Sequence, residues 1–230
     1  MNPFTVGVAF SEGWQVMKKN YGVFLGASFV YMLTVIVVSA IPIIGVIVYF
    51  FAVPPLFGGW FLVGIKGYRE SVEFRDLFGG FKKYASMLGL FWLLALIFLA
   101  TFIPLGISAL LAMTIASQMR NVGIVLMVIG GLISIVIMLV ISVRTLLCFA
   151  ICLDSELWAV DSLKKCWNVT APHTWTLVGL LFCLIVVNSL LALPLFIPWL
   201  FLGLPWALGI IGVIYSRIVG PVEIEGQVVA

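Results

Sequence analysis

Six long apolar stretches, separated by short polar segments, constrain this chain more than any other feature of its sequence. A helix needs about 20 apolar residues to cross a hydrocarbon layer about 30 Å thick. A chain of 230 residues that is 64% hydrophobic and only 9% charged cannot bury that much apolar surface in water. The sequence therefore predicts six membrane-spanning helices, over residues 22–41, 43–65, 86–112, 122–151, 175–193 and 196–218.

The basic residues lie almost entirely in segments that would share one side of the membrane. If the N-terminus is cytoplasmic, eleven of the 12 lysines and arginines fall on the cytoplasmic side and only Arg120 falls outside. Cytoplasmic segments of membrane proteins carry such an excess of positive charge. We therefore expect both ends of the chain to face the cytoplasm. The eleven residues are Lys18, Lys19, Lys66, Arg69, Arg75, Lys82, Lys83, Arg144, Lys164, Lys165 and Arg217.

A short segment with aromatic residues opposite basic ones precedes each odd-numbered span. These segments, around residues 10–19, 74–83 and 157–167, have the pattern of amphipathic helices that lie at the level of the lipid headgroups. The outer links near Pro42 and Pro194 are only a few residues long, so the spans pair as hairpins. The predicted fold is an all-α membrane protein of three helical hairpins, each preceded by a cytoplasmic amphipathic interfacial helix. We expect these three helices to serve as topology anchors.

The same arrangement recurs three times within a single membrane domain, residues 1–230. The units span about residues 5–67, 71–153 and 155–220, and all three begin on the same side of the membrane. The middle unit departs from the others, with Phe81 in place of tryptophan. The match could also arise from the composition that membrane helices share. The corresponding residues of the first and third units are Trp14 and Trp167, Pro42 and Pro194, Pro55 and Pro205, and Gly59 and Gly209.

Proline and glycine interrupt the second and sixth spans at corresponding places. Proline removes a backbone N–H and clashes with the carbonyl four residues earlier, so residues 53–60 (V-P-P-L-F-G-G-W) and 202–209 (L-G-L-P-W-A-L-G) should kink or unwind. Such paired interruptions indicate a ligand site in transporters, whereas elsewhere they only shape helix packing. A polar amide in the fifth span could join such a site. The candidate ligand or hinge residues are Pro54, Pro55, Gly58, Gly59, Pro205, Gly209 and Asn188.

Arg144 is the charge whose environment depends most on the position of its span. If the fourth span starts at Val122, Arg144 lies about 33 Å along it, at the cytoplasmic interface. A start near Leu132 would instead place it mid-membrane, where it would need a partner. The distribution of basic residues favours the interface, and we predict an ion pair between Arg144 and Asp154. No span core holds an acidic residue, which argues against a carrier driven by protons or cations through membrane carboxylates.

Signatures of enzymes, metal sites and nucleic-acid binding are absent from the sequence. The single histidine, His173, has no acidic or nucleophilic neighbour, and no P-loop, G-x-S-x-G or H-E-x-x-H motif is present. The four cysteines form no C-x-x-C pair and have the pattern of small buried hydrophobic residues. We therefore predict a non-enzyme with no catalytic residue, no cofactor, no metal ligand and no nucleic-acid partner.

Three segments of the chain resemble those of uncharacterised bacterial integral membrane proteins with about six spans. They are residues 13–20 (G-W-Q-V-M-K-K-N), 69–84 (R-E-S-V-E-F-R-D-L-F-G-G-F-K-K-Y) and 161–170 (D-S-L-K-K-C-W-N-V-T). Cys166 stands where those proteins have serine. A more distant similarity is to the membrane region of some glycerophosphodiester phosphodiesterases. The resemblance covers nearly the whole chain and implies a bacterial cytoplasmic (inner) membrane, but no activity.

Two classes of function remain from the sequence. One is a small transport- or channel-type helix bundle for a solute or lipid, which predicts a polar cavity between Pro55 and Pro205. The other is a non-catalytic scaffold or accessory subunit that binds lipid or another membrane protein, which predicts a filled bundle with an apolar outer groove. The sequence favours the first narrowly. The expected partners are membrane lipids, with a second copy of the chain or another membrane protein as further possibilities.

Overall fold

The computed structural model describes residues 5–69, 72–115, 120–155, 157–193 and 197–220, and every regular element within them is a helix. Pro194 and the start of the sixth predicted span lie outside these residues. The elements are α1 (Val6–Lys19), α2 (Tyr21–Ala40), α3 (Ile44–Tyr68), the 3₁₀ helix η1 (Phe74–Lys83), α4 (Tyr84–Ala100), α5 (Ile103–Ile115), α6 (Arg120–Thr145), α7 (Cys148–Asp154), α8 (Ala159–Thr170), the 3₁₀ turn η2 (Ala171–His173), α9 (Thr174–Ala192), the π-helical turn η3 (Trp199–Gly203) and α10 (Leu204–Ile218).

Six helical stretches in the described residues are long and apolar enough to cross a membrane. Each overlaps one predicted span, so the all-helical class and the number of candidate spans agree with the sequence analysis. The third and fourth stretches bend, at the α4–α5 turn near Thr101 and at the α6–α7 turn after Thr145. The six stretches are Tyr21–Ala40, Ile44–Tyr68, Phe74–Thr114, Asn121–Asp154, Ala159–Ala192 and Trp199–Ile218.

Helices α3 and α10 form the centre of the fold. In the apolar 18-residue window of α3, 50% of the residues are buried, and in that of Trp199–Ile218 56% are buried. The corresponding share is only 11% for Asn121–Asp154 and for Ala159–Ala192. The two helices touch through their backbones, because a Cβ atom added at Gly212 would overlap the carbonyl oxygen of Gly64. Small residues allow such close approach between membrane helices. The other long helices expose apolar side chains, as lipid-facing helices do.

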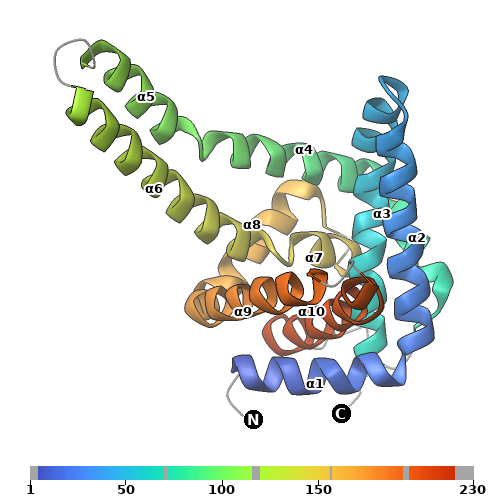
Figure 1. The fold of residues 1–230 in the computed structure, drawn as a ribbon. Helices are drawn as coiled ribbons and strands as arrows, with labels where there is room; N and C mark the ends of the chain where they lie inside the picture. The colour runs from blue at the N-terminus through green and yellow to red at the C-terminus, as the bar shows by residue number, and fades with distance from the viewer. Residues whose placement is uncertain (1–4, 70–71, 116–119, 156, 194–196, 221–230) are drawn as a thin grey trace.

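Helices α5 and α6 pack along each other and run away from the rest of the molecule (Figure 1). A Cβ atom at Gly130 of α6 would overlap the hydroxyl of Ser108 on α5, so glycine permits this contact. The backbone N–H of Leu105 donates to the hydroxyl of Ser134 across the pair, at 3.2 Å. This bond satisfies one of the free donors in the first turn of α5.

The segment η1 is helical, as the sequence predicts, but it is a 3₁₀ helix of 10 residues. Runs of 3₁₀ helix longer than three or four residues are uncommon. Its first turn is stabilised by a reciprocal cap, in which Glu73 and Asp76 each accept from the backbone N–H of the other. Most of its other contacts are with α3, against which it lies.

Candidate functional site

The prolines of the second span do not interrupt it. Helix α3 runs continuously from Ile44 to Tyr68 through Pro54 and Pro55, where the sequence predicted a kink or an unwound segment. In the sixth span a π-helical turn, η3, does precede Pro205. Proline is tolerated within membrane helices where neighbouring groups compensate for the lost hydrogen bonds.

The glycines that follow the prolines in α3 are contact points for other segments. A Cβ atom at Gly59 would overlap the backbone carbonyl oxygen of Leu77 in η1, and one at Gly80 of η1 would overlap that of Pro55. A Cβ atom at Gly58 would meet the sulfur of Met87, in α4. The pattern P-P-L-F-G-G therefore lets η1 lie backbone to backbone on α3.

The corresponding part of α10 contacts α1 in the same manner. A Cβ atom at Gly209 would overlap the carbonyl oxygen of Gly13, so α1 lies backbone to backbone on α10. In both α3 and α10, a basic residue C-terminal to this glycine forms an ion pair with the docked segment. Lys66 of α3 binds Asp76 of η1 at 2.6 Å, and Arg217 of α10 binds Glu12 of α1.

Neighbouring side chains also stabilise the turn before Pro205. Proline at position 205 leaves the carbonyl of Phe201 without its helical donor. The hydroxyl of Tyr21, from α2, donates to that oxygen at 3.1 Å. The side-chain amide of Asn188 donates to Leu184 within α9, and its oxygen lies against Gly203 of η3. The candidate residues at this turn thus contact other helices.

We expect Tyr21→Phe to lower the free energy of unfolding by about 1 kcal/mol, because it removes a single neutral hydrogen bond. Chemical unfolding in detergent micelles, followed by circular dichroism, measures the difference. Tyr84→Phe is a matched control, since Tyr84 is exposed. Equal stability of the two variants would mean that the Phe201 carbonyl does not depend on Tyr21.

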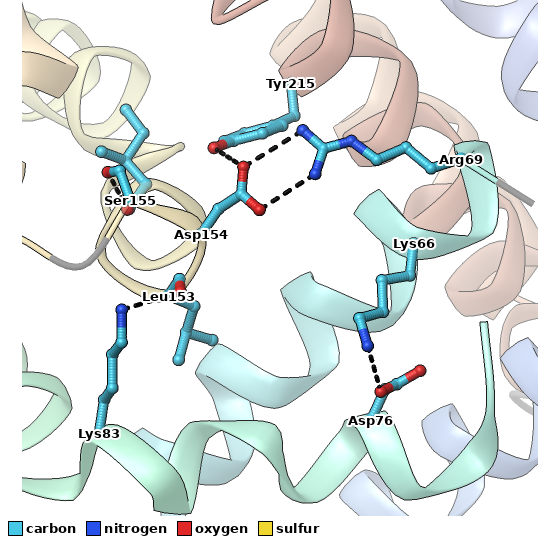
Figure 2. A network of polar contacts seen from close by, with 9 residues as sticks. Lys66, Arg69, Asp76, Lys83, Leu153, Asp154, Ser155 and Tyr215 are labelled. Atoms are coloured by element: carbon cyan, nitrogen blue, oxygen red, sulfur yellow. Dashed lines mark hydrogen bonds and ion pairs between the residues drawn. The ribbon is translucent and has the colours of Figure 1, made fainter. Parts of the chain in front are cut away.

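A partly buried polar cluster joins the ends of three helices. The guanidinium of Arg69, at the end of α3, binds both carboxylate oxygens of Asp154 at the end of α7, at 3.0 and 3.2 Å. The hydroxyl of Tyr215, on α10, donates to the same carboxylate at 2.7 Å. Figure 2 shows these three side chains facing one another, with the Lys66–Asp76 pair beside them. Bidentate, charge-assisted bonds of this kind are the strong ones in proteins.

The last carbonyls of α7 are also satisfied within this cluster. The ammonium of Lys83, at the end of η1, donates to the carbonyls of Cys152 and Leu153 at 3.3 and 3.1 Å (Figure 2). A cation at a helix C-terminus is favoured by the helix dipole. The cluster thus ties α3, η1, α7 and α10 together at one end of the fold, and each of its charges has a partner.

The predicted ion pair between Arg144 and Asp154 is corrected by the structure, where Asp154 pairs with Arg69. The turn after Thr145 separates α6 from α7, and the guanidinium of Arg144 lies over the ring of Trp167 in α8, 4.5 Å from its centroid. The backbone carbonyl of Arg144 accepts from Cys166 and Thr170 of α8, at 3.1 and 3.3 Å. Cation–π contact with α8 therefore takes the place of the predicted pair.

An apolar cavity of about 270 Å³ lies beside Pro54, between α2, α3, α4 and α7. Its walls are largely aromatic and include two tyrosines, Tyr31 and Tyr49. Sequence reasoning found only Pro54 among the residues that form it. Tyrosine is enriched at the membrane interfaces, so Tyr31 near the middle of its predicted span was the signal that could have located it. The lining residues are Tyr31, Tyr49, Val53, Pro54, Phe57, Phe91, Leu94, Ala95, Phe98 and Phe149.

A second cavity, of about 410 Å³, lies where α8 meets α4 and the end of α6. It differs from the first in carrying a charged side chain, Lys164, and the amide of Asn168. Comparison with protein-family models, curated proteins and solved structures found no match to this chain.

Proposed function

We propose that this chain is a non-catalytic polytopic membrane protein that binds a membrane-soluble, lipid-like ligand in the aromatic cavity beside Pro54. In this role it would act as an accessory or scaffold subunit. The observation that supports the proposal is the cavity itself, whose walls are apolar and aromatic. Small-molecule sites have this character, with a few placed polar groups. Tyr31, Tyr49 and Ala95 at its rim are partly exposed, so the cavity opens onto the lipid-facing surface of the bundle.

The packing of the candidate hinge residues favours this proposal over transport. A transport site at the interrupted spans needs free carbonyls that face a cavity between Pro55 and Pro205. The backbone carbonyl of Pro55 instead lies against Gly80 of η1. The carbonyl of Phe201, four residues before Pro205, accepts a hydrogen bond from Tyr21. The cavity found here lies at Pro54, toward α2 and α4. A filled centre with an apolar outer cavity is what the scaffold interpretation expects.

We further propose that the spans form three hairpins, each led by an interfacial helix, α1, η1 or α8, in a bacterial inner membrane with the basic ends cytoplasmic. The similar ways in which these helices dock support a threefold repeat. Each carries a small residue, Gly13, Gly80 or Cys166, just before its aromatic residue, and each of these meets the backbone of α10, α3 or α6. Every interfacial helix would then lie on the second span of the preceding unit, with α1 on α10 closing the ring.

We expect Ala95→Trp to abolish ligand binding, because the indole would fill much of the cavity from α4. The probe is a phosphatidylcholine analogue with a diazirine in one acyl chain, added to protein in nanodiscs and cross-linked by light. Saturable labelling should map to peptides that contain Tyr31, Phe57 or Phe98 in the unmodified protein. The variant should lose that labelling, since the indole occupies the space of the ligand.

Leu96→Trp is the matched control, because Leu96 lies on the same helix with 63% of its surface exposed. This variant should label as the unmodified protein does, and should fold equally well. Equal saturable labelling of the cavity peptides in both variants would contradict the proposal. If Ala95→Trp removed labelling from the second cavity near Trp167, and not from the aromatic cavity, the proposal would also be contradicted.

A further inference from the structure

Two tyrosines, Tyr31 and Tyr49, line the aromatic cavity. Neither the Tyr31 nor the Tyr49 hydroxyl is hydrogen-bonded to any residue that the structure describes, although other tyrosines of the chain, such as Tyr21 and Tyr215, are. Tyr31 is the eleventh residue of the 20-residue helix α2, so it lies about 15 Å from either end. A hydroxyl at that depth cannot rely on bulk water, and leaving it unpaired in hydrocarbon is costly.

The walls of the cavity disfavour a charged ligand group and favour a planar ring. Among the residues that the structure describes, no lysine, arginine or histidine lines it, so an anionic headgroup would find no counter-charge from them. Most of its lining residues are aromatic. Tyr31 and Phe57 of the lining pack against Trp60, and the rings of Phe57 and Trp60 lie at an interplanar angle of 10°. Phe91 of the lining packs against Phe50, with ring centroids 6.1 Å apart. Aromatic rings form favourable stacked and edge-to-face contacts with another planar ring.

These features favour a neutral ligand that bears hydrogen-bond acceptors and presents a ring. An isoprenoid quinone has these properties, with two carbonyl oxygens on one ring and an apolar tail. We propose that the cavity binds the ring of such a quinone, with the Tyr31 and Tyr49 hydroxyls donating to its carbonyl oxygens. A volume of about 270 Å³ suits a ring, and the tail would leave through the rim at Ala95 and Phe98. This inference rests on the ligand-binding role proposed above and names the class of ligand.

Binding of a decyl-substituted benzoquinone to the purified full chain in nanodiscs tests the proposal. The lipid of the nanodisc contains no quinone, and the probe is titrated while the melting temperature is followed. The unmodified protein should be stabilised in a saturable way. Tyr31→Phe combined with Tyr49→Phe keeps the shape of the cavity and removes both donors. It should weaken the apparent affinity roughly 30-fold, because two neutral hydrogen bonds are lost.

Three comparisons decide the outcome. Tyr84→Phe, an exposed tyrosine outside the cavity, should bind the probe as the unmodified protein does. Unchanged affinity in the double variant would overturn the assignment of the hydroxyls. Absence of quinone binding, together with lipid labelling that Ala95→Trp abolishes, would overturn the quinone class and leave the ligand-binding function standing. Absence of both would overturn that function as well.

Discussion

Gly59→Ala is expected to lower the free energy of unfolding by about 3 kcal/mol, because a methyl group at this position would overlap the backbone carbonyl of Leu77. A flexible side chain could move aside, but a backbone carbonyl held in η1 can move only with the whole segment. The substitution should therefore push η1 away from α3 and weaken the nearby Lys66–Asp76 ion pair. Thermal or denaturant unfolding in micelles measures the loss, and hydrogen exchange along η1 locates it.

Gly106→Ala is the control for the change in helix propensity alone. Among the described residues, a Cβ added at Gly106, in α5, would meet no atom within 4 Å apart from its chain neighbours and its own helix backbone. Alanine is favoured over glycine inside a helix by about 1 kcal/mol, so this variant should be slightly more stable than the unmodified protein. If the Gly59→Ala variant proved as stable as the Gly106→Ala variant, η1 would not lie on α3 as described.

Arg69→Ala is expected to destabilise the protein by about 2 kcal/mol, because it leaves the Asp154 carboxylate without a cation. The side chain of Asp154 is only 14% exposed, so water can replace the guanidinium only in part. Tyr215 would remain as its one hydrogen-bond donor in the cluster. The expected result is a less stable contact between the ends of α3, α7 and α10, measured by chemical unfolding.

Asp154→Asn in the Arg69→Ala background separates the lost contact from the unpaired charge. The neutral amide still accepts from Tyr215, so the double variant should recover more than half of the lost stability. A double-mutant cycle over these two positions gives their coupling directly. Additive effects of the two substitutions would show that Arg69 and Asp154 do not act as a pair.

Much of the architecture follows from the order of residues along the chain. Six apolar stretches need six helices in lipid, since unsatisfied backbone groups are excluded there. The helical segments around residues 10–19, 74–83 and 157–167 were found from the spacing of their aromatic residues. The recurrence of proline followed by glycine four residues later marked Gly59 and Gly209 as special. Each of these inferences depends on local spacing, which the sequence contains completely.

The role of those glycines required the tertiary structure. A glycine after a proline is compatible with a hinge, a ligand site or a close helix contact, and the sequence alone did not decide among them. Only the position of Leu77 against Gly59, and of Gly13 against Gly209, identifies close contact. The partners lie 18 residues away in one case and 196 in the other, so no local pattern specifies them.

Charge pairing and the cavity depended on the tertiary structure in the same way. Arg144 and Asp154 are close in sequence, yet the turn after Thr145 turns α7 toward the end of α3, where Arg69 is in reach. The cavity beside Pro54 is built from four helices, and its two tyrosines come from two of them. The sequence by itself determined that the chain is helical, apolar and charged at its helix ends, because these properties are local. The packing of distant helices decided which groups meet, because that depends on shape in three dimensions.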